Sequence, residues 1–267
     1  MLILLSPAKT LDTDTPVPSA LRQATTEPLF SAQAQRLINT LKRKGPRAVA
    51  KLMGLSSALA QLNVQRYRAF SLPATPANSR PAVLTFAGDV YTGLDAPSLS
   101  RADLLWAQEH LVILSGLYGA LRPLDALQPY RLEMGTTLPL GRARNLYAYW
   151  GDLLTEHLNQ RLEQQSQRQA GQAVLVNLAS QEYFKAVQPA ALRGRLIECV
   201  FEDQAPDTGG YKVVGFFAKR ARGMMARYAV QQRLTQPEGL REFTAGGYAY
   251  AAAASTAERW VFRRQRA

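Results

Sequence analysis

Four charged side chains could carry catalysis or bind phosphate, and each follows an apolar run in the chain. Lys9 comes after the first run, Asp89 after the second, and Glu182 and Lys185 after a later one. A carboxylate beside a lysine can transfer protons, and a buried lysine can form a Schiff base with a carbonyl group. Lysines also neutralise phosphates. The residue types alone leave both chemistries open.

Further cations lie in comparable places. Arg122 and Arg131 fall in a turn-rich stretch that follows the apolar run 111–114, and the acids Asp125 and Glu133 accompany them. We interpret these two acids as groups that hold the arginines in place rather than as catalysts, although a loop braced only by its own ion pairs is the plain alternative. A last basic group follows the apolar run 211–217 and consists of Lys219, Arg220 and Arg222.

The apolar runs predict the elements that position these side chains. Short apolar segments at 1–5, 81–86, 111–114, 173–178, 196–202 and 211–217 indicate strands. Segments with helical spacing lie at 31–44, 46–53, 57–70, 101–110 and 145–165, and another helix is expected at 224–234. Ser100 and Asp103 have the spacing of a capping box at the start of one of these helices. The tail, at 246–254 and 259–265, is expected to form a hairpin at the edge of the sheet.

The order of these elements predicts an α/β fold. We expect one domain over residues 1–267, with surrounding helices and a mixed sheet that has parallel connections and at least one antiparallel hairpin at 196–217. Ligands of such sheets gather beyond the carboxyl ends of the strands. Five of the predicted strands, at 1–5, 81–86, 111–114, 173–178 and 211–217, are followed by the charged groups named above. If these five strand ends converge, they form a basic cleft.

The charge balance favours a polyanionic partner. The chain of 267 residues carries 32 Lys and Arg against 20 Asp and Glu, a net charge of +12. No acid occurs between Pro28 and Gly88, and a second stretch without acids runs from Tyr211 to Pro237. Such an excess favours nucleic acid as the partner. A basic surface that serves only solubility is the alternative.

Residues 46–67 predict two helices joined by a short turn in basic surroundings. The start of the second helix can offer free backbone N–H groups to a phosphate, and Lys51 lies just before the turn. Helices that merely pack together would show the same pattern.

Several other classes of protein are disfavoured. No apolar run is long enough for a membrane helix, and the chain start lacks the basic region of a signal peptide, so we expect a cytoplasmic protein. The single cysteine, Cys199, cannot form an internal disulfide, and the apolar run around it indicates a buried thiol. His110 and His157 have no partners at metal-ligand spacing. No phosphate-binding loop or dinucleotide fingerprint is present. We therefore expect no metal and no cofactor.

Several long motifs together resemble the YaaA family of bacterial peroxide stress proteins. They are residues 6–9 (SPAK), 88–94 (GDVYTGL), 114–135, 149–152 (YWGD), 177–180 (NLAS), 182–185 (EYFK) and 219–223 (KRARG). The resemblance implies a cytosolic protein induced by hydrogen peroxide that limits damage linked to iron. It also implies DNA binding, an unusual α/β topology with a positively charged cleft, and a helix-hairpin-helix element, which we map to 46–67. The resemblance brings no catalytic residues.

The leading hypothesis is a monomeric DNA-binding stress protein that holds duplex or distorted DNA through its phosphates. The candidate contacts are Lys9, Lys51, Arg122, Arg131, Lys185, Lys219, Arg220 and Arg222. The alternative is an enzyme that acts on a nucleotide, a nucleobase or a nucleic-acid lesion in the same cleft. Its candidate residues are Lys9, Asp89, Glu182 and Lys185. A third possibility, iron sequestration, fits poorly with two histidines and one cysteine.

Overall fold

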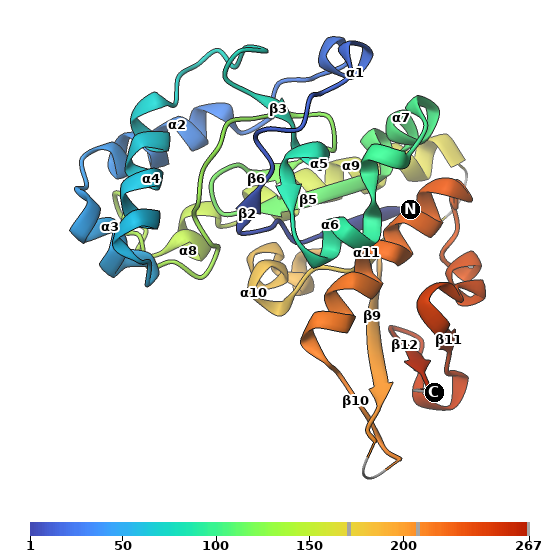
Figure 1. Cartoon of the computed structure of the whole chain (residues 1–267). Coiled ribbons are helices and arrows are strands. Elements are labelled where there is room, and N and C mark those ends of the chain that lie inside the picture. The colour runs from blue at the N-terminus through green and yellow to red at the C-terminus, as the bar shows by residue number, and fades with distance from the viewer. Residues whose placement is uncertain (170–171, 207–208, 266–267) are drawn as a thin grey trace.

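A mixed β-sheet forms the centre of the molecule (Figure 1). The structure is a computed structural model and describes residues 1–169, 172–206 and 209–265. Within these ranges the sheet has eight strands in the order β11-β12-β9-β8-β1-β5-β6, with β10 paired to β9. The parallel strands are β1 (Leu2–Leu5), β5 (Leu111–Ser115), β8 (Val174–Asn177), β9 (Arg195–Gln204) and β12 (Arg259–Arg264). The antiparallel strands are β6 (Gly119–Leu121), β10 (Tyr211–Lys212) and β11 (Tyr248–Tyr250).

Two small ladders accompany the main sheet. The first pairs β2 (Thr10–Leu11) with β4 (Phe86–Ala87), and the second pairs β3 (Arg80–Pro81) with β7 (Ala126–Leu127). Both are antiparallel. The first ladder joins the segment after β1 to β4. The second joins the segment before α5 to the loop after β6.

Helices cover the sheet and form both ends of the molecule. The longer ones are α2 (Ser31–Lys42), α3 (Pro46–Met53), α4 (Ser57–Ala69), α7 (Arg101–His110), α9 (Leu153–Gln169) and α11 (Gly215–Gln231). The shorter ones are α1 (Ser19–Gln23), α5 (Ala82–Thr85), α6 (Asp89–Leu94), α8 (Leu146–Trp150) and α10 (Gln181–Phe184). Short 3₁₀ helices lie at Ala96–Ser98, Lys185–Val187, Pro189–Ala191, Pro237–Glu242, Ala245–Gly247 and Ala252–Ala254.

The arrangement of these elements leaves two projecting parts. Figure 1 shows α2, α3 and α4 at one end of the molecule, whereas β9, β10 and the first turns of α11 project from the other part. Helices α8 and α10 lie between them. A single hydrophobic cluster nevertheless connects α2, the central strands and β12, and Trp150 and Trp260 are among its fully buried side chains.

The predicted α/β fold with a mixed sheet is confirmed. Strand β1 is buried along its whole length, as its apolar sequence indicates, because neighbouring strands and covering helices enclose it. The capping box is also present, since Ser100 and Asp103 exchange side-chain and backbone hydrogen bonds at the start of α7. The tail pairs as a hairpin, but β12 lies inside the sheet between β11 and β9.

Two local predictions were wrong. The run 81–86 is not one strand. Helix α5 occupies Ala82–Thr85, between the two-residue strands β3 and β4. The residues that follow, Asp89–Leu94, form α6. The run 211–217 is a strand only at Tyr211–Lys212, and α11 begins at Gly215.

The last correction changes the position of the basic group 219–222. Its residues lie within a 17-residue helix and not in a loop after a strand. Successive residues of a helix point about 100° apart. Lys219, Arg220 and Arg222 therefore do not form one strand end.

Candidate functional site

The carboxyl ends of β1 and β8 meet through two serines. The backbone N–H of Ser180 donates to Oγ of Ser6 at 2.8 Å, and the Oγ atoms of the two residues lie 3.3 Å apart. Tyr91 of α6 donates from its hydroxyl to the carbonyl of Ser6 at 3.0 Å. Parallel pairing in register places these ends side by side. The predicted convergence of strand ends is therefore confirmed for β1 and β8.

Strand β5 contributes a third end. Ser115 closes β5 and shares a 2.6 Å hydrogen bond with the hydroxyl of Tyr130. The hydroxyl of Ser115 also accepts a hydrogen bond from the backbone N–H of Tyr118 at 2.9 Å. Burial raises the pKa of Tyr91, Tyr130 and Tyr183, so these phenols stay neutral near pH 7 and serve as hydrogen-bonding groups, not as bases.

A cluster of three charged residues lies beside these ends. Arg131 binds Oε1 of Glu133 at 2.9 Å, and Lys9 lies 3.6 Å from the same oxygen. The side chains of Arg131 and Glu133 are 17% and 15% exposed, whereas that of Lys9 is 67% exposed. Oε2 of Glu133 is buried and has no hydrogen-bond partner among the described residues. Lys9 is therefore the cation of this cluster that can reach an external anion.

The depression at this cluster is small. Its volume is about 10 Å³, and Pro7, Tyr130 and Tyr183 contribute to its walls. A cavity of this size holds at most about one water molecule. The strand ends thus form a surface and not a substrate pocket.

Asp89, Glu182 and Lys185 lie around the same region. The pairing of β2 with β4 brings Gly88, which precedes Asp89, close to Ala8, since a Cβ atom at Gly88 would lie 3.4 Å from that of Ala8. Glu182 accepts a hydrogen bond from the backbone N–H of Gly135 at 3.0 Å. The ammonium group of Lys185 lies 5.2 Å from the ring centre of Tyr147, a cation–π distance.

The second arginine of the turn-rich stretch, Arg122, pairs with a buried acid. Nε of Arg122 lies 3.2 Å from Asp125, whose side chain is 2% exposed. Thr26 donates to the same carboxylate at 2.6 Å, and burial raises its pKa while these donors lower it. Both acids of this stretch, Asp125 and Glu133, hold arginines, as the sequence indicated.

The cations of α11 point in different directions. Lys219 is exposed, and Arg220 lines a surface hollow together with Arg227. Arg222 is largely buried near Glu198 of β9, and burial lowers its pKa. Its Nε atom has no hydrogen-bond partner among the described residues. Lys219 and Arg220 are therefore the members of this group that solvent reaches.

The helix pair predicted for 46–67 is present as α3 and α4. Gly54 ends α3 in the left-handed conformation, with φ of 62°, which glycine adopts without a steric cost. Ser56 caps α4 by accepting a hydrogen bond from the N–H of Leu59. This cap takes the N–H of Leu59, and the N–H groups of Ser57 and Ala58 before it have no intrahelical acceptor.

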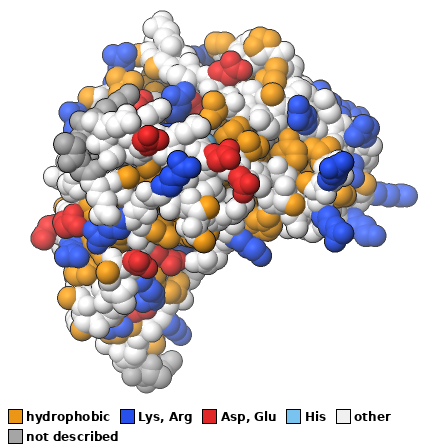
Figure 2. Space-filling view, turned by 180° about the vertical axis from the view of Figure 1, so that it is seen from behind, with side chains coloured by type: hydrophobic (Ala, Val, Ile, Leu, Met, Phe, Trp, Pro, Cys, Tyr) orange, Lys and Arg blue, Asp and Glu red, His pale blue; other side chains and the backbone are white. Residues whose placement is uncertain are grey.

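Exposed cations gather at the end of the molecule that contains these helices. Figure 2 shows Lys and Arg side chains there without a neighbouring acid. This agrees with the sequence, which has no Asp or Glu between Pro28 and Gly88. The exposed cations of this end are Arg36, Arg43, Arg47, Lys51 and Arg68. We name this group the α2–α4 basic surface. Within the described ranges none of its members forms an ion pair.

Sequence comparison places the whole chain in one family. The family described as peroxide stress protein YaaA matches residues 1–254. The chain belongs to the YaaA family. UPF0246 proteins are similar over their full lengths: 57% identical over 266 residues in Leptothrix cholodnii, with 99% of this chain and 98% of the relative covered. The relative from Bordetella pertussis is 55% identical over 267 residues, with both chains fully covered.

Membership of the YaaA family confirms the resemblance carried by the motifs and connects the protein with peroxide stress. In this YaaA-family chain, the described residues contain no group of three or more His, Cys, Asp or Glu side chains that could hold a metal ion. Likewise, none of the helices in the described ranges has the length and apolar character needed to cross a membrane.

Two parts of the site were not foreseen from the YaaA-family sequence. The bond between Ser6 and Ser180 joins residues 174 positions apart, and no local pattern signals it. The basic surface on α2–α4 was visible as charge, but only Lys51 was named as a candidate contact. The absence of acids across that whole stretch was the signal that could have identified Arg43 and Arg47.

Proposed function

We propose that this protein binds DNA during peroxide stress, mainly through phosphate contacts of the α2–α4 basic surface. The observation that carries the proposal is the set of exposed, unpaired cations on this surface, together with the overall charge of +12. Cations that neutralise phosphates release the counterions condensed on DNA, and this release favours binding. Lys51 and the start of α4 add a place where one phosphate can accept backbone hydrogen bonds.

The surface extends toward the strand ends. The hydroxyl of Tyr67 on α4 donates to the carbonyl of Arg131 at 2.5 Å, which fixes the helix pair beside the cluster that contains Lys9. Lys185 directly follows α10, and Lys219 and Arg220 lie on the projecting α11. DNA held on α2–α4 would meet these outer cations only if it crosses α8 and α10.

Binding fits this geometry better than catalysis. The cluster of Lys9 and Glu133 surrounds a space of about 10 Å³, which is too small for a nucleotide. Glu182 and Lys185 have internal contacts, with Gly135 and with Tyr147. We expect the protein to limit iron-linked oxidative damage by occupying DNA during peroxide stress.

The proposal is tested by fluorescence anisotropy with two duplexes of unrelated sequence. A variant with Arg43→Gln, Arg47→Gln and Lys51→Gln should lose at least about tenfold in affinity for both duplexes alike, since phosphate contacts carry no sequence information. A Lys219→Gln and Arg220→Gln variant reports whether DNA reaches α11. Arg193→Gln removes an exposed arginine outside the proposed surface and serves as the control. Unchanged affinity of the triple variant would refute the proposed surface.

A further inference from the structure

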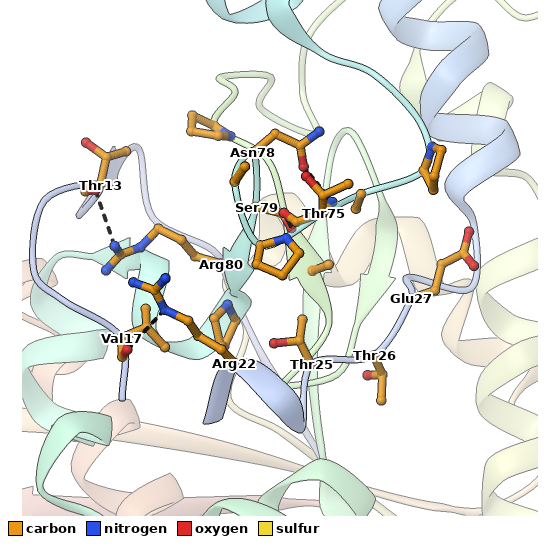
Figure 3. Close-up of a pocket in the computed structure, with 17 residues that line it drawn as sticks. Thr13, Val17, Arg22, Thr25, Thr26, Glu27, Thr75, Asn78, Ser79 and Arg80 are labelled. Atoms are coloured by element: carbon orange, nitrogen blue, oxygen red, sulfur yellow. Dashed lines mark hydrogen bonds between the residues drawn. The ribbon is translucent and has the colours of Figure 1, made fainter. Parts of the chain in front are cut away.

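A roomy cavity lies away from the strand ends and from the α2–α4 basic surface. Its volume is about 450 Å³, within the range of small-molecule sites. The segment 13–27 forms one wall, the proline-rich segment 73–81 forms another, and Ala126 and Pro129 close the bottom. Figure 3 shows side chains from both segments directed around this space.

Hydrogen bonds hold the walls in place. Thr26 is fixed between the buried carboxylate of Asp125, at 2.6 Å, and the side-chain amide of Gln108, at 2.9 Å. On the opposite wall Asn78 accepts from the N–H of Thr75 at 2.7 Å, and Ser79 donates to the carbonyl of Thr75 at 2.6 Å. Because the walls are already ordered, a ligand does not have to order them when it binds. This lowers the entropic cost of binding.

Two arginines face this cavity without a carboxylate partner. Arg80 donates to the carbonyls of Thr13 and Thr15, at 3.3 and 2.5 Å, and Arg22 donates through Nε to the carbonyl of Val17 at 3.1 Å. Within the described ranges neither arginine forms an ion pair with an acid, and Nε of Arg80 is buried without an acceptor. Carbonyl oxygens orient the two guanidinium groups. The pKa of Asp12 is lowered mainly by its hydrogen bonds with Thr15 and in smaller part by the charge of Arg80, so this acid offsets part of that charge. No carboxylate among the described residues bonds to either guanidinium group, so an anion in the cavity would complete the site.

The opposite side of the cavity has a different character. Glu27 lies there, well separated from the two arginines in Figure 3, and Thr25 and Asn78 line the space between. Prolines 73, 76 and 81 provide apolar surface. This layout suits a molecule with one anionic end, a body that packs on apolar rings, and hydroxyl or amino groups at the other end. The carboxylate of Glu27 disfavours a second phosphate.

We propose that this cavity binds a nucleoside monophosphate, with the phosphate on Arg22 and Arg80 and the nucleoside against the prolines. This site is independent of DNA binding on α2–α4.

Isothermal titration calorimetry tests the proposal with adenosine monophosphate and thymidine monophosphate against adenosine and inorganic phosphate. We expect the monophosphates to bind at least tenfold more tightly than either fragment, since only they satisfy both ends of the cavity. Adenosine that binds as tightly as its monophosphate, or the absence of measurable heat at millimolar monophosphate, would overturn the proposal.

Variants locate the site. Arg22→Gln and Arg80→Gln should each weaken monophosphate binding about tenfold, whereas Arg193→Gln should leave it unchanged. Because Arg80 also holds the segment 13–17, a second variant, Ala77→Trp, fills the cavity from an exposed position and leaves both arginines in place. Monophosphate binding that persists in Ala77→Trp and in Arg22→Gln would contradict the assignment. DNA affinity of these variants should match that of the wild type, which separates this test from that of the proposed function.

Discussion

Tyr67 on α4 donates a hydrogen bond to the carbonyl of Arg131, at 2.5 Å across 64 positions of the chain. The ring of Tyr67 is fully buried. Burial and the nearby charge of Glu133 raise the pKa of the phenol, so it remains a donor at neutral pH. Through this contact the basic helix pair and the charged cluster at the strand ends keep one relative position.

Loss of this hydroxyl should weaken both stability and DNA binding. Tyr67→Phe keeps the buried ring and leaves the carbonyl of Arg131 without its donor, which we expect to cost about 1–2 kcal/mol in the free energy of unfolding. Affinity for duplex DNA should fall a few-fold because α4 is no longer fixed. Urea denaturation and anisotropy measure the two effects. Tyr250→Phe, which removes a hydroxyl at the edge strand β11, should change neither property appreciably.

Close packing of α6 against α11 should make one glycine irreplaceable. A Cβ atom at Gly223 would lie 1.8 Å from the carbonyl oxygen of Val90, and backbone cannot yield as a flexible side chain does. Gly223→Ala is therefore expected to destabilise the protein by at least about 3 kcal/mol. Gly215→Ala, in the same helix but with open space around its Cβ, should stay within about 0.5 kcal/mol of the wild type. Equal stabilities of the two variants would contradict the packing.

His157 should make the protein less stable in mild acid. Burial, followed by the charges of Arg161 and Arg122, lowers its pKa from 6.5 to about 4. The folded histidine thus stays neutral while the unfolded one takes up a proton below pH 6.5, so stability is lost as the pH falls toward 4. His157→Phe keeps the ring beside Phe30 and removes this linkage.

Denaturation at pH 7 and at pH 5 measures the effect of His157. Between these values the wild type should lose about 2 kcal/mol more than His157→Phe, at about 1.4 kcal/mol per pH unit below the ordinary pKa. Carboxylates and His110 titrate in both proteins and cancel in the comparison. Equal losses would show that His157 is protonated in the folded state.

The sequence predicted the parts of the fold that local patterns control. Strands β1, β5 and β8 are apolar runs buried on both faces, and the capping box of Ser100 and Asp103 marks the start of α7. The run 81–86 failed because a short apolar segment has the same composition in a strand and in a buried helical turn.

The errors around α11 have a tertiary cause. Residues 215–217 look like strand in isolation, but the backbone of α11 at Arg220, Gly223 and Met224 packs closely on α6, and this contact favours helix. The same contact fixes where Lys219, Arg220 and Arg222 point, so their convergence could not be inferred from their spacing. The charge pattern predicted a polyanion surface, but only the structure placed its exposed cations together on α2–α4.

The salt dependence of duplex affinity tests the central claim most directly. If the α2–α4 basic surface neutralises phosphates, the logarithm of the association constant should fall steeply and linearly with the logarithm of salt concentration. The variant with Arg43→Gln, Arg47→Gln and Lys51→Gln should show a slope smaller by about 1 for each cation removed, or about 3 in all. A wild-type affinity that does not change with salt, or an identical slope in the variant, would contradict the account.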